Sequence, residues 1–405
     1  MEQKQAAFTT GHGRGRFIPK FYFNMKVIIK RIFLSALALV LVVLISGTAF
    51  MNFSPQFGGM ISEAEKALYR NSGHYKDGIF LNEEEIVMEL NCHSLQQMIR
   101  ETFRPDPAVV PDHNIEVEKV SPETIGSLPD SLTQIIWLGH SSFIIETAGM
   151  VILLDPVFGQ YASPHPMLGR KRFNAEMPVT IEQLPKIDAV IISHDHYDHL
   201  DYESIMELKA KTDHFFVPLG VGSHLKRWEI PAEKITEMDW WQEQPFKNLN
   251  IIFTPSRHMS GRGLTDQSAT LWGSWIINNP YAKLYFSGDG GYGRHFKAIG
   301  EKYGPFDVAL MECGQYNELW RDVHMMPEET VQASIEVGAK FIIPIHWGSF
   351  ALATHSWTDP VERVTTAAEL VNLPLATPRI GEVIILPQMS GPTHEHWWTE
   401  SEATL

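Results

Sequence analysis

Five short apolar runs, each leading to a histidine or an aspartate, constrain the fold of this chain more than any other feature of its sequence. The runs cover residues 151–154, 189–192, 251–253, 284–286 and 341–345, and they lead to Asp155, His194, His258, Asp289 and His346. Short runs rich in isoleucine and valine are typical of buried strands. One such strand would indicate little, but a ligand-type residue after each of several strands predicts one site along one rim of a sheet sandwich.

The second run leads into the densest cluster of chemical groups, His194-Asp195-His196-Tyr197-Asp198-His199. Imidazole nitrogens and carboxylate oxygens are ligands that Zn²⁺ accepts, whereas Asp195 and Tyr197 are not expected to be ligands. Asp201 then suits the N-cap of a helix over residues 202–211. Four ligand groups within six residues exceed what one tetrahedral ion needs, so we expect two divalent ions, with Zn²⁺ favoured, about 3.5–4 Å apart.

The spacing of this cluster resembles the H-x-H-x-D-H signature of the metallo-β-lactamase superfamily. The resemblance implies an α/β (α+β) fold, a four-layer αββα sandwich with metals at one edge. It also implies a ligand set in three parts. His194, His196 and His258 would hold one ion, Asp198, His199 and His346 would hold the other, and Asp289 would bridge them.

Several flanking strings are similar to the N-acyl-phosphatidylethanolamine phospholipase D branch of that superfamily. They begin at Leu138 (LGHSSF), Leu154 (LDPVF), Ser260 (SGRGL), Leu271 (LWGSW), His324 (HMMPEE) and His346 (HWGSFAL), and the match spans roughly residues 53–390. The string SPQFGG from Ser54 is a further part of it. This resemblance implies that a hydroxide bridging the two ions attacks phosphorus, releasing an N-acylethanolamine and leaving phosphatidate.

The two ions would lower the pKa of the water between them and neutralise charge on the phosphoryl group. We expect the reaction to depend on Asp198, Asp289 and His324, and His324 would hydrogen-bond a phosphoryl oxygen or protonate the leaving alkoxide. The alternative for His324 is an ordinary loop histidine before a helix that starts near Met326.

Four further residues are expected near the ions or the substrate. Asp155 would orient a metal ligand, with an Asp-Pro turn as the alternative, and His140 would lie beside the metals or simply form a tight turn. Arg257 and Arg262 flank the third ligand and would hold a phosphodiester by paired donors, with solvated loop arginines as the alternative.

Two aromatic stretches receive different interpretations. The segment 158–173 is long for a connection and carries Phe158, Tyr161 and Phe173, so it is a candidate lid or lipid-facing rim, with an ordinary surface loop as the alternative. The alternating sequence of residues 271–276 indicates strand core and not a binding platform.

An uncharged apolar run from Ile32 to Met51 is about the length that a helix needs to cross a bilayer. Seven basic side chains and one acidic one lie in residues 1–31, which predicts a cytoplasmic N-terminus and a single-pass anchor with the folded domain outside. A cleavable signal peptide, starting from Met25 and leaving a secreted or periplasmic protein, is the alternative.

The expected organisation is a basic segment 1–31, an anchor or signal peptide 32–51, an extension 52–130 that packs on the catalytic domain, a hydrolase domain 131–395 and a tail 396–405. The net charge of −15 argues against a nucleic-acid partner. Two cysteines exclude a disulfide scaffold. The partners expected are a membrane phospholipid substrate and a second copy of the chain in a homodimer.

Three other functions compete with this interpretation. A hydrolase of a lactone, a β-lactam or another phosphodiester fits the same metals, because a fold does not choose its substrate. An oxygen-reducing di-iron enzyme of the superfamily is disfavoured, because that group typically has an acidic residue where this chain has His196. A non-catalytic membrane-tethered binding protein is disfavoured by the complete ligand set.

Overall fold

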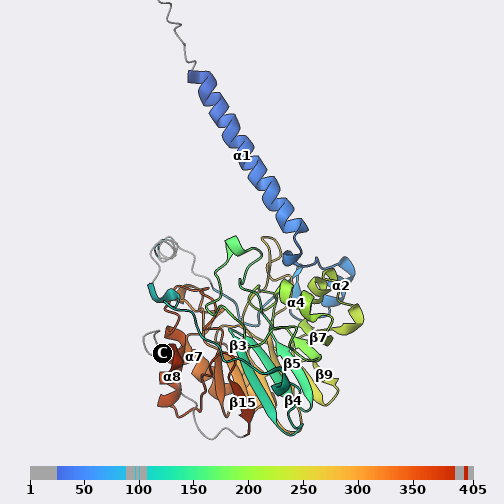
Figure 1. The fold of residues 1–405 in the computed structure, drawn as a ribbon. Helices are drawn as coiled ribbons and strands as arrows, with labels where there is room; N and C mark the ends of the chain where they lie inside the picture. The colour runs from blue at the N-terminus through green and yellow to red at the C-terminus, as the bar shows by residue number, and fades with distance from the viewer. Residues whose placement is uncertain (1–24, 88–95, 97–99, 101–106, 388–395, 400–405) are drawn as a thin grey trace, which may run out of the picture. The chain divides into compact units, whose positions relative to one another are not determined.

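Two β-sheets packed face to face form the centre of the folded domain in the structure, which is a computed structural model (Figure 1). It describes residues 25–87, 96, 100, 107–387 and 396–399. Most of the basic segment 1–31 and the end of the tail 396–405 lie outside these residues. The chain divides into two compact units, Met1–Ser54 and Pro55–Leu405, so the extension from residue 55 onward belongs to the same unit as the hydrolase domain.

The larger sheet has seven strands, and five of them run in the same direction. In order across the sheet they are β15 (Val383–Leu386), β3 (Thr133–Gly139), β4 (Ser142–Thr147), β5 (Met150–Leu154), β6 (Ile187–Ile191), β7 (Thr212–Pro218) and β8 (Ile235–Met238). Strand β4 is antiparallel to both β3 and β5, and β5 through β8 are parallel. Strands β3, β5 and β6 therefore end at the same edge.

The second sheet has six strands, and four of them also run in one direction and end at a shared edge. In order they are β14 (Ile342–Ile345), β13 (Val308–Glu312), β12 (Lys283–Phe286), β11 (Ser274–Asn278), β10 (Leu249–Thr254) and β9 (Glu243–Phe246). Strand β11 is antiparallel to both β10 and β12, while β12, β13 and β14 are parallel. The five predicted apolar runs coincide with strands β5, β6, β10, β12 and β14, although Ile192 lies just after β6 and Phe341 just before β14.

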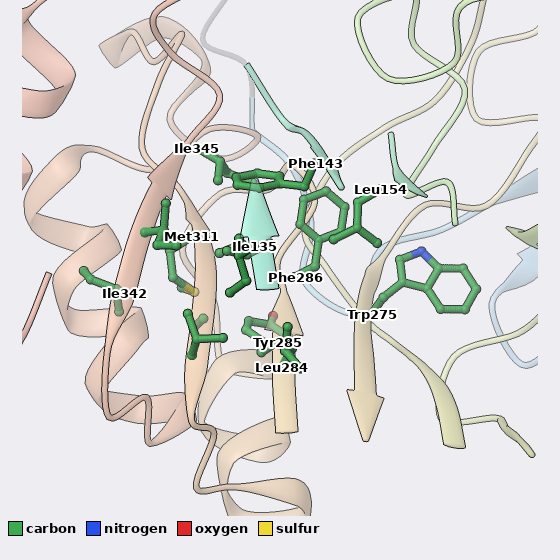
Figure 2. Packing of buried hydrophobic residues seen from close by; sticks show 14 of the residues in the cluster. Ile135, Phe143, Leu154, Trp275, Leu284, Tyr285, Phe286, Met311, Ile342 and Ile345 are labelled. Carbon is green, nitrogen blue, oxygen red and sulfur yellow. The ribbon is translucent and has the colours of Figure 1, made fainter. Parts of the chain in front are cut away.

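Side chains alternate between the two faces of each sheet, as the period of two in a strand requires. In β3, Ile135 and Trp137 join the core between the sheets, whereas Ile136 and Leu138 join the core on the other face. Figure 2 shows the inter-sheet core, where Phe143 and Leu154 of one sheet lie close to residues such as Phe286 of the other. The continuous apolar character of these strands follows from burial on both faces.

Helices cover the outer face of each sheet and complete the four-layer αββα sandwich that the resemblance implied. On the seven-stranded sheet they are α4 (Tyr202–Leu208) and α5 (Gly222–Arg227). On the six-stranded sheet they are α6 (His295–Tyr303), α7 (Pro327–Val337) and α8 (Asp359–Leu370). Asp201 caps α4 by accepting a hydrogen bond from the Ser204 N–H, as predicted, but the helix ends at Leu208.

The remaining described elements are short. They are the helix α2 (Glu63–Tyr69), the hairpin β1 (Tyr75–Lys76) and β2 (Ile79–Phe80), and the 3₁₀ turns η1 (Pro55–Phe57), η2 (Pro107–Val109), η3 (Pro122–Thr124), η4 (Pro166–Leu168), η5 (Ala232–Lys234), η6 (Glu318–Trp320) and η7 (Trp397–Thr399). Trp397 and Trp398, which were expected in a tail, are buried, and both contact Trp347.

The apolar run lies in α1, a helix from Met25 to Phe53. Its 29 residues span about 43 Å at 1.5 Å per residue. The helix extends beyond the predicted bounds of 32 and 51 on both sides, and on the N-terminal side Lys26, Lys30 and Arg31 are good helix formers. By length and composition it can cross a membrane.

Candidate metal centre

The strand ends of both sheets bring the predicted ligands together at one edge of the sandwich. From the seven-stranded sheet, β3 leads to His140, β5 to Asp155 and β6 to the loop 194–199. From the six-stranded sheet, β10 leads to His258, β12 to Asp289 and β14 to His346. Trp275 of β11 donates a hydrogen bond over 2.9 Å to the Ile192 carbonyl, which ties the two sheets together beside the loop.

Three histidine nitrogens form the first group. His196 Nδ1 lies 2.9 Å from His194 Nε2 and 3.3 Å from His258 Nε2. Ligand atoms 2.0–2.1 Å from a tetrahedral ion are about 3.3 Å apart, so these three nitrogens have the spacing that one ion requires. His194 and His258 are buried and His196 is half-buried. Three imidazole nitrogens that converge at this spacing are suited to bind one cation.

The second group combines a carboxylate with imidazoles. Asp198 Oδ2 lies 3.2 Å from His346 Nε2 and 3.4 Å from His199 Nε2. His140 Nε2 lies 2.8 Å from the same oxygen, so His140 contacts the second group and does not merely form a turn.

Asp289 lies between the two groups, where a bridging carboxylate would be. Its Oδ2 is 3.1 Å from His199 Nε2 and 3.0 Å from His346 Nε2. The same oxygen is 3.8 Å from His194 Nε2 and 3.9 Å from His258 Nε2. Among the described residues, the buried Oδ1 of Asp289 has no hydrogen-bond partner. An unpartnered carboxylate oxygen in a buried histidine cluster fits a metal ligand.

The backbone around the site adopts conformations that cost energy. His140, Asp155 and His346 have positive φ angles of 54°, 36° and 68°, which side chains other than glycine rarely adopt. At Gly288 a Cβ would lie 2.7 Å from the Gly273 carbonyl oxygen, so only glycine allows this close approach. Strained residues at three strand ends are typical of a functional site that the surrounding fold holds in place.

Acceptors behind the ligands fix the orientation of three imidazole rings. Asp155 Oδ2 lies 2.7 Å from His199 Nδ1, the Val323 carbonyl lies 2.9 Å from His258 Nδ1, and the Gly314 carbonyl lies 3.2 Å from His346 Nδ1. In a neutral ring, an Nδ1–H that donates to one of these oxygens leaves the Nε2 lone pair facing the cluster, as a metal ligand requires.

His324 lies beside the cluster, although it belongs to no strand end. Its ring centroid is 5.1 Å from that of His258 and 5.0 Å from that of His346. Its Nδ1 is 3.3 Å from Glu312 Oε1, while Glu312 Oε2 accepts a hydrogen bond from the Met325 N–H. The sequence interpretation missed Glu312, although it follows the apolar run 308–311 in the same way as the other ligand-type residues.

The two groups differ in their acid–base behaviour. Burial lowers the pKa of His194 and His258 well below the ordinary histidine value. Burial also opposes the charged form of His199 and His346, yet the carboxylate of Asp289 raises the pKa of both well above that value. In the protein without metal, the first group is therefore neutral and the second holds protons.

The two arginines that were expected to hold a phosphodiester are bonded to the protein instead. Arg262 is 4% exposed, so the alternative of a solvated loop residue is wrong for it. It donates hydrogen bonds to the carbonyl oxygens of Gln56, Asp195 and Leu200. Arg257 is paired with Asp322 at 2.8 Å.

The candidate rim segment 158–173 presents apolar side chains to solvent. Met167 is 88% and Leu168 is 67% exposed, both in η4, whereas Phe173 is buried. Leu264, two residues after Arg262, is 82% exposed. In contrast, Leu271, Trp272 and Trp275 are buried, which confirms that residues 271–276 belong to the core, although strand β11 begins only at Ser274.

Comparisons with known proteins agree with this fold. A family model described as a beta-lactamase superfamily domain matches residues 151–347. An uncharacterized protein of Mycobacterium tuberculosis is 38% identical over 351 residues, which cover 85% of this chain and 92% of that protein. A Caenorhabditis elegans protein named N-acyl-phosphatidylethanolamine-hydrolyzing phospholipase D 1 is 32% identical over 306 residues, covering 71% of this chain and 85% of that protein. An isothiocyanate hydrolase from Delia radicum gut bacteria superposes with a TM-score of 0.50 at 18% identity, covering 62% of this chain and 98% of that one, a likeness of fold alone.

Proposed function

Since this chain belongs to the metallo-β-lactamase superfamily and is a metal-dependent hydrolase of that fold, we propose that it cleaves a membrane phosphodiester as a phospholipase D. The proposed substrate is N-acyl-phosphatidylethanolamine, and the products are an N-acylethanolamine and phosphatidate. The observation that carries this proposal is the convergence of the His/Asp cluster at one edge of the sandwich, in a chain 32% identical to a relative named for that reaction.

The roles of the residues follow from their positions. His194, His196 and His258 would hold one divalent ion, Asp198, His199 and His346 would hold the second, and Asp289 would bridge them. Bound there, two such ions supply a water of lowered pKa and neutralise charge on the attacked phosphoryl group. Asp155 holds His199 in the tautomer that leaves Nε2 available for the ion. His140 donates a hydrogen bond to Asp198 while Asp198 holds the second ion.

His324 is the proposed proton donor. Its ring lies against the rings of one residue from each group, His258 and His346. Because Glu312 accepts from the Nδ1–H, His324 can donate a proton from Nε2 to substrate only as the imidazolium, in which both ring nitrogens are protonated. A proton delivered from His324 to the leaving alkoxide would complete the hydrolysis.

Two features favour a lipid over a soluble substrate. Helix α1 ends at Phe53, and only Ser54 separates it from η1, so a helix that crosses a membrane would leave Pro55 at the membrane surface. Met167, Leu168 and Leu264 are large apolar side chains exposed on two loops, and one of these loops follows His258 in the chain. Exposed apolar side chains suit contact with a lipid surface.

The full-length protein in detergent, mixed with vesicles containing N-acyl-phosphatidylethanolamine, provides the test. Mass spectrometry of the products should show N-acylethanolamine and phosphatidate in equal amounts, with release abolished by a chelator and restored by added metal. If the metal-loaded protein releases neither product but hydrolyses a soluble lactone or β-lactam, the phospholipase proposal is wrong and the alternative hydrolase function is favoured.

A further inference from the structure

The segment Pro55–Gly59, which we call the strap, binds to the catalytic domain through its backbone. Five side chains bond to its peptide groups. Trp228 donates to the Pro55 carbonyl over 2.8 Å, Arg262 to the Gln56 carbonyl over 2.8 Å, Ser223 to the Gly59 carbonyl over 3.2 Å, Arg227 to the Gly58 carbonyl, and His224 Nδ1 accepts from the Gly59 N–H over 2.9 Å. A segment of five residues held by five side chains has a defined position.

Two glycines let the strap approach this closely. A Cβ on Gly58 would lie 2.0 Å from His224 Nδ1, and Gly58 has a φ of 71°. A Cβ on Gly59 would lie 2.1 Å from the Ser223 carbonyl oxygen. Any other residue would push the strap away from α5, because no real Cβ contact is that short.

His224 connects the strap to the loop 194–199, which we call the metal loop. Its Nδ1 accepts from a backbone N–H, so Nδ1 carries no proton and Nε2 is the protonated nitrogen. That Nε2 lies 3.2 Å from Asp195 Oδ2, and it therefore donates to this carboxylate. Asp195 and His224 are both buried, so the bond is shielded from water.

Asp195 lies between the proposed ligands His194 and His196, and its carboxylate holds the loop in place. Besides His224, the Gly261 N–H donates to it over 2.7 Å and the Thr270 hydroxyl over 2.8 Å. With the carboxylate fixed by three donors, the backbone on either side of Asp195 has one orientation. The two flanking imidazoles then point to the same place.

We propose that His224 is a positioning residue that fixes the metal loop against the strap, so that the segment directly after α1 is part of the apparatus that shapes the first metal site. The inference rests on the metal site described under the proposed function, though not on its substrate. A chain that binds metal but cleaves no phospholipid would disprove the substrate and leave this inference intact. Losing an outer partner of this kind typically weakens metal binding about 10–100-fold.

Two variants of His224 separate its two bonds. Gln at this position places an amide N–H near the former Nε2 and keeps the bond to Asp195, whereas Asn places its amide near the former Nδ1 and keeps only the bond to Gly59. Metal-free full-length protein in detergent is titrated with Co²⁺ against a competing chelator, while the visible spectrum reports the geometry of the bound ion. The unfolding midpoint of each variant measures whether the fold is kept.

We expect His224→Gln to bind the more tightly held of the two Co²⁺ ions with nearly the wild-type affinity and spectrum. His224→Asn should bind it about 10–100-fold more weakly, with an altered spectrum and a similar unfolding midpoint. The matched control is His214→Asn, since His214 is bonded to the Thr236 hydroxyl in the β7–β8 pair. Wild-type affinity in His224→Asn, or equal weakening in both His224 variants, would overturn the proposal.

A second pair of variants tests the strap without changing His224. Gly59→Ala should displace the strap and weaken Co²⁺ binding, because its methyl group would overlap the Ser223 carbonyl. Gly73→Ala is the control, since a Cβ there meets nothing within 4 Å. Unchanged Co²⁺ affinity in Gly59→Ala would show that the strap has no influence on the metal loop.

Discussion

Asp155 Oδ2 lies 2.7 Å from His199 Nδ1, and both side chains are completely buried. The other oxygen of Asp155 accepts from the Ser193 N–H over 2.7 Å, so the carboxylate is fixed from the strand end that leads to the metal loop. Burial raises the pKa of the Asp155 carboxyl group. The hydrogen bonds that it accepts from His199 and Ser193 nevertheless favour its charged form. The pair therefore determines which nitrogen of His199 faces Asp289.

Asp155→Asn removes the charge behind His199 while it keeps the shape of the side chain. The ring of His199 should lose its fixed tautomer, and affinity for the ion of the second group should fall about 10–100-fold. Chelator competition measures this affinity. Asp188→Asn is the control, because Asp188 lies in β6 and is paired with Lys247. Equal affinity in Asp155→Asn and wild type would show that the pair does not position a ligand.

His324→Ala separates proton donation from metal binding. We expect kcat to fall about 10²–10⁴-fold, which is the usual contribution of a general acid, while metal content stays at the wild-type level. The measurements are turnover and elemental analysis of the same sample. His113→Ala is the control, since His113 is paired with Asp112 and lies before the hydrolase core. Loss of metal from His324→Ala would instead make His324 a ligand.

The opposite pKa shifts of the two groups predict that acid removes the two ions in order. His199 and His346 hold protons in the metal-free protein because their pKa values are raised, so an ion must displace those protons. His194 and His258 have lowered pKa values and stay neutral to lower pH. Metal content after dialysis from about pH 8 to about pH 5 should fall in two steps. The step at higher pH should be absent from His346→Asn, and its persistence there would contradict the assignment.

The two arginines should differ in their effect on stability. Arg262→Met leaves three carbonyls without their donor in a buried place, which should lower the free energy of unfolding by roughly 2–4 kcal/mol. Arg257→Met removes a half-buried ion pair with Asp322 and should cost less. Denaturant unfolding of both variants measures the difference. If Arg262→Met raised KM for the phospholipid at unchanged stability, the residue would bind substrate after all.

The sequence was sufficient to predict the strands and the cluster because both depend on local patterns. Each apolar run has the length of a buried strand, and the topology of the two sheets aligns the ends of β5, β6, β10, β12 and β14 at one edge. The ligand-type residues of the loop 194–199 lie within six positions of one another, so chain connectivity already keeps them close together.

Contacts between remote segments could not be predicted in the same way. Arg262 has the sequence surroundings of a solvated loop arginine, and only the packing of residues 56, 195 and 200 around it shows where its donors point. His224 and Gly59 are 165 residues apart. Trp397 is buried because Trp347, next to the ligand candidate His346, offers an aromatic surface that no local pattern reveals.

Metal content and turnover of Asp289→Asn, measured on one preparation beside the wild type, test the central claim most directly. The account predicts about two ions per chain in the wild type, because Asp289 Oδ2 lies near histidines of both groups. The amide variant should lose metal and turnover together, whereas Asp213→Asn, which alters an ion pair with Lys186, should lose neither. An Asp289→Asn protein that keeps wild-type turnover, or a wild type that is fully active with one ion, would contradict the two-metal mechanism.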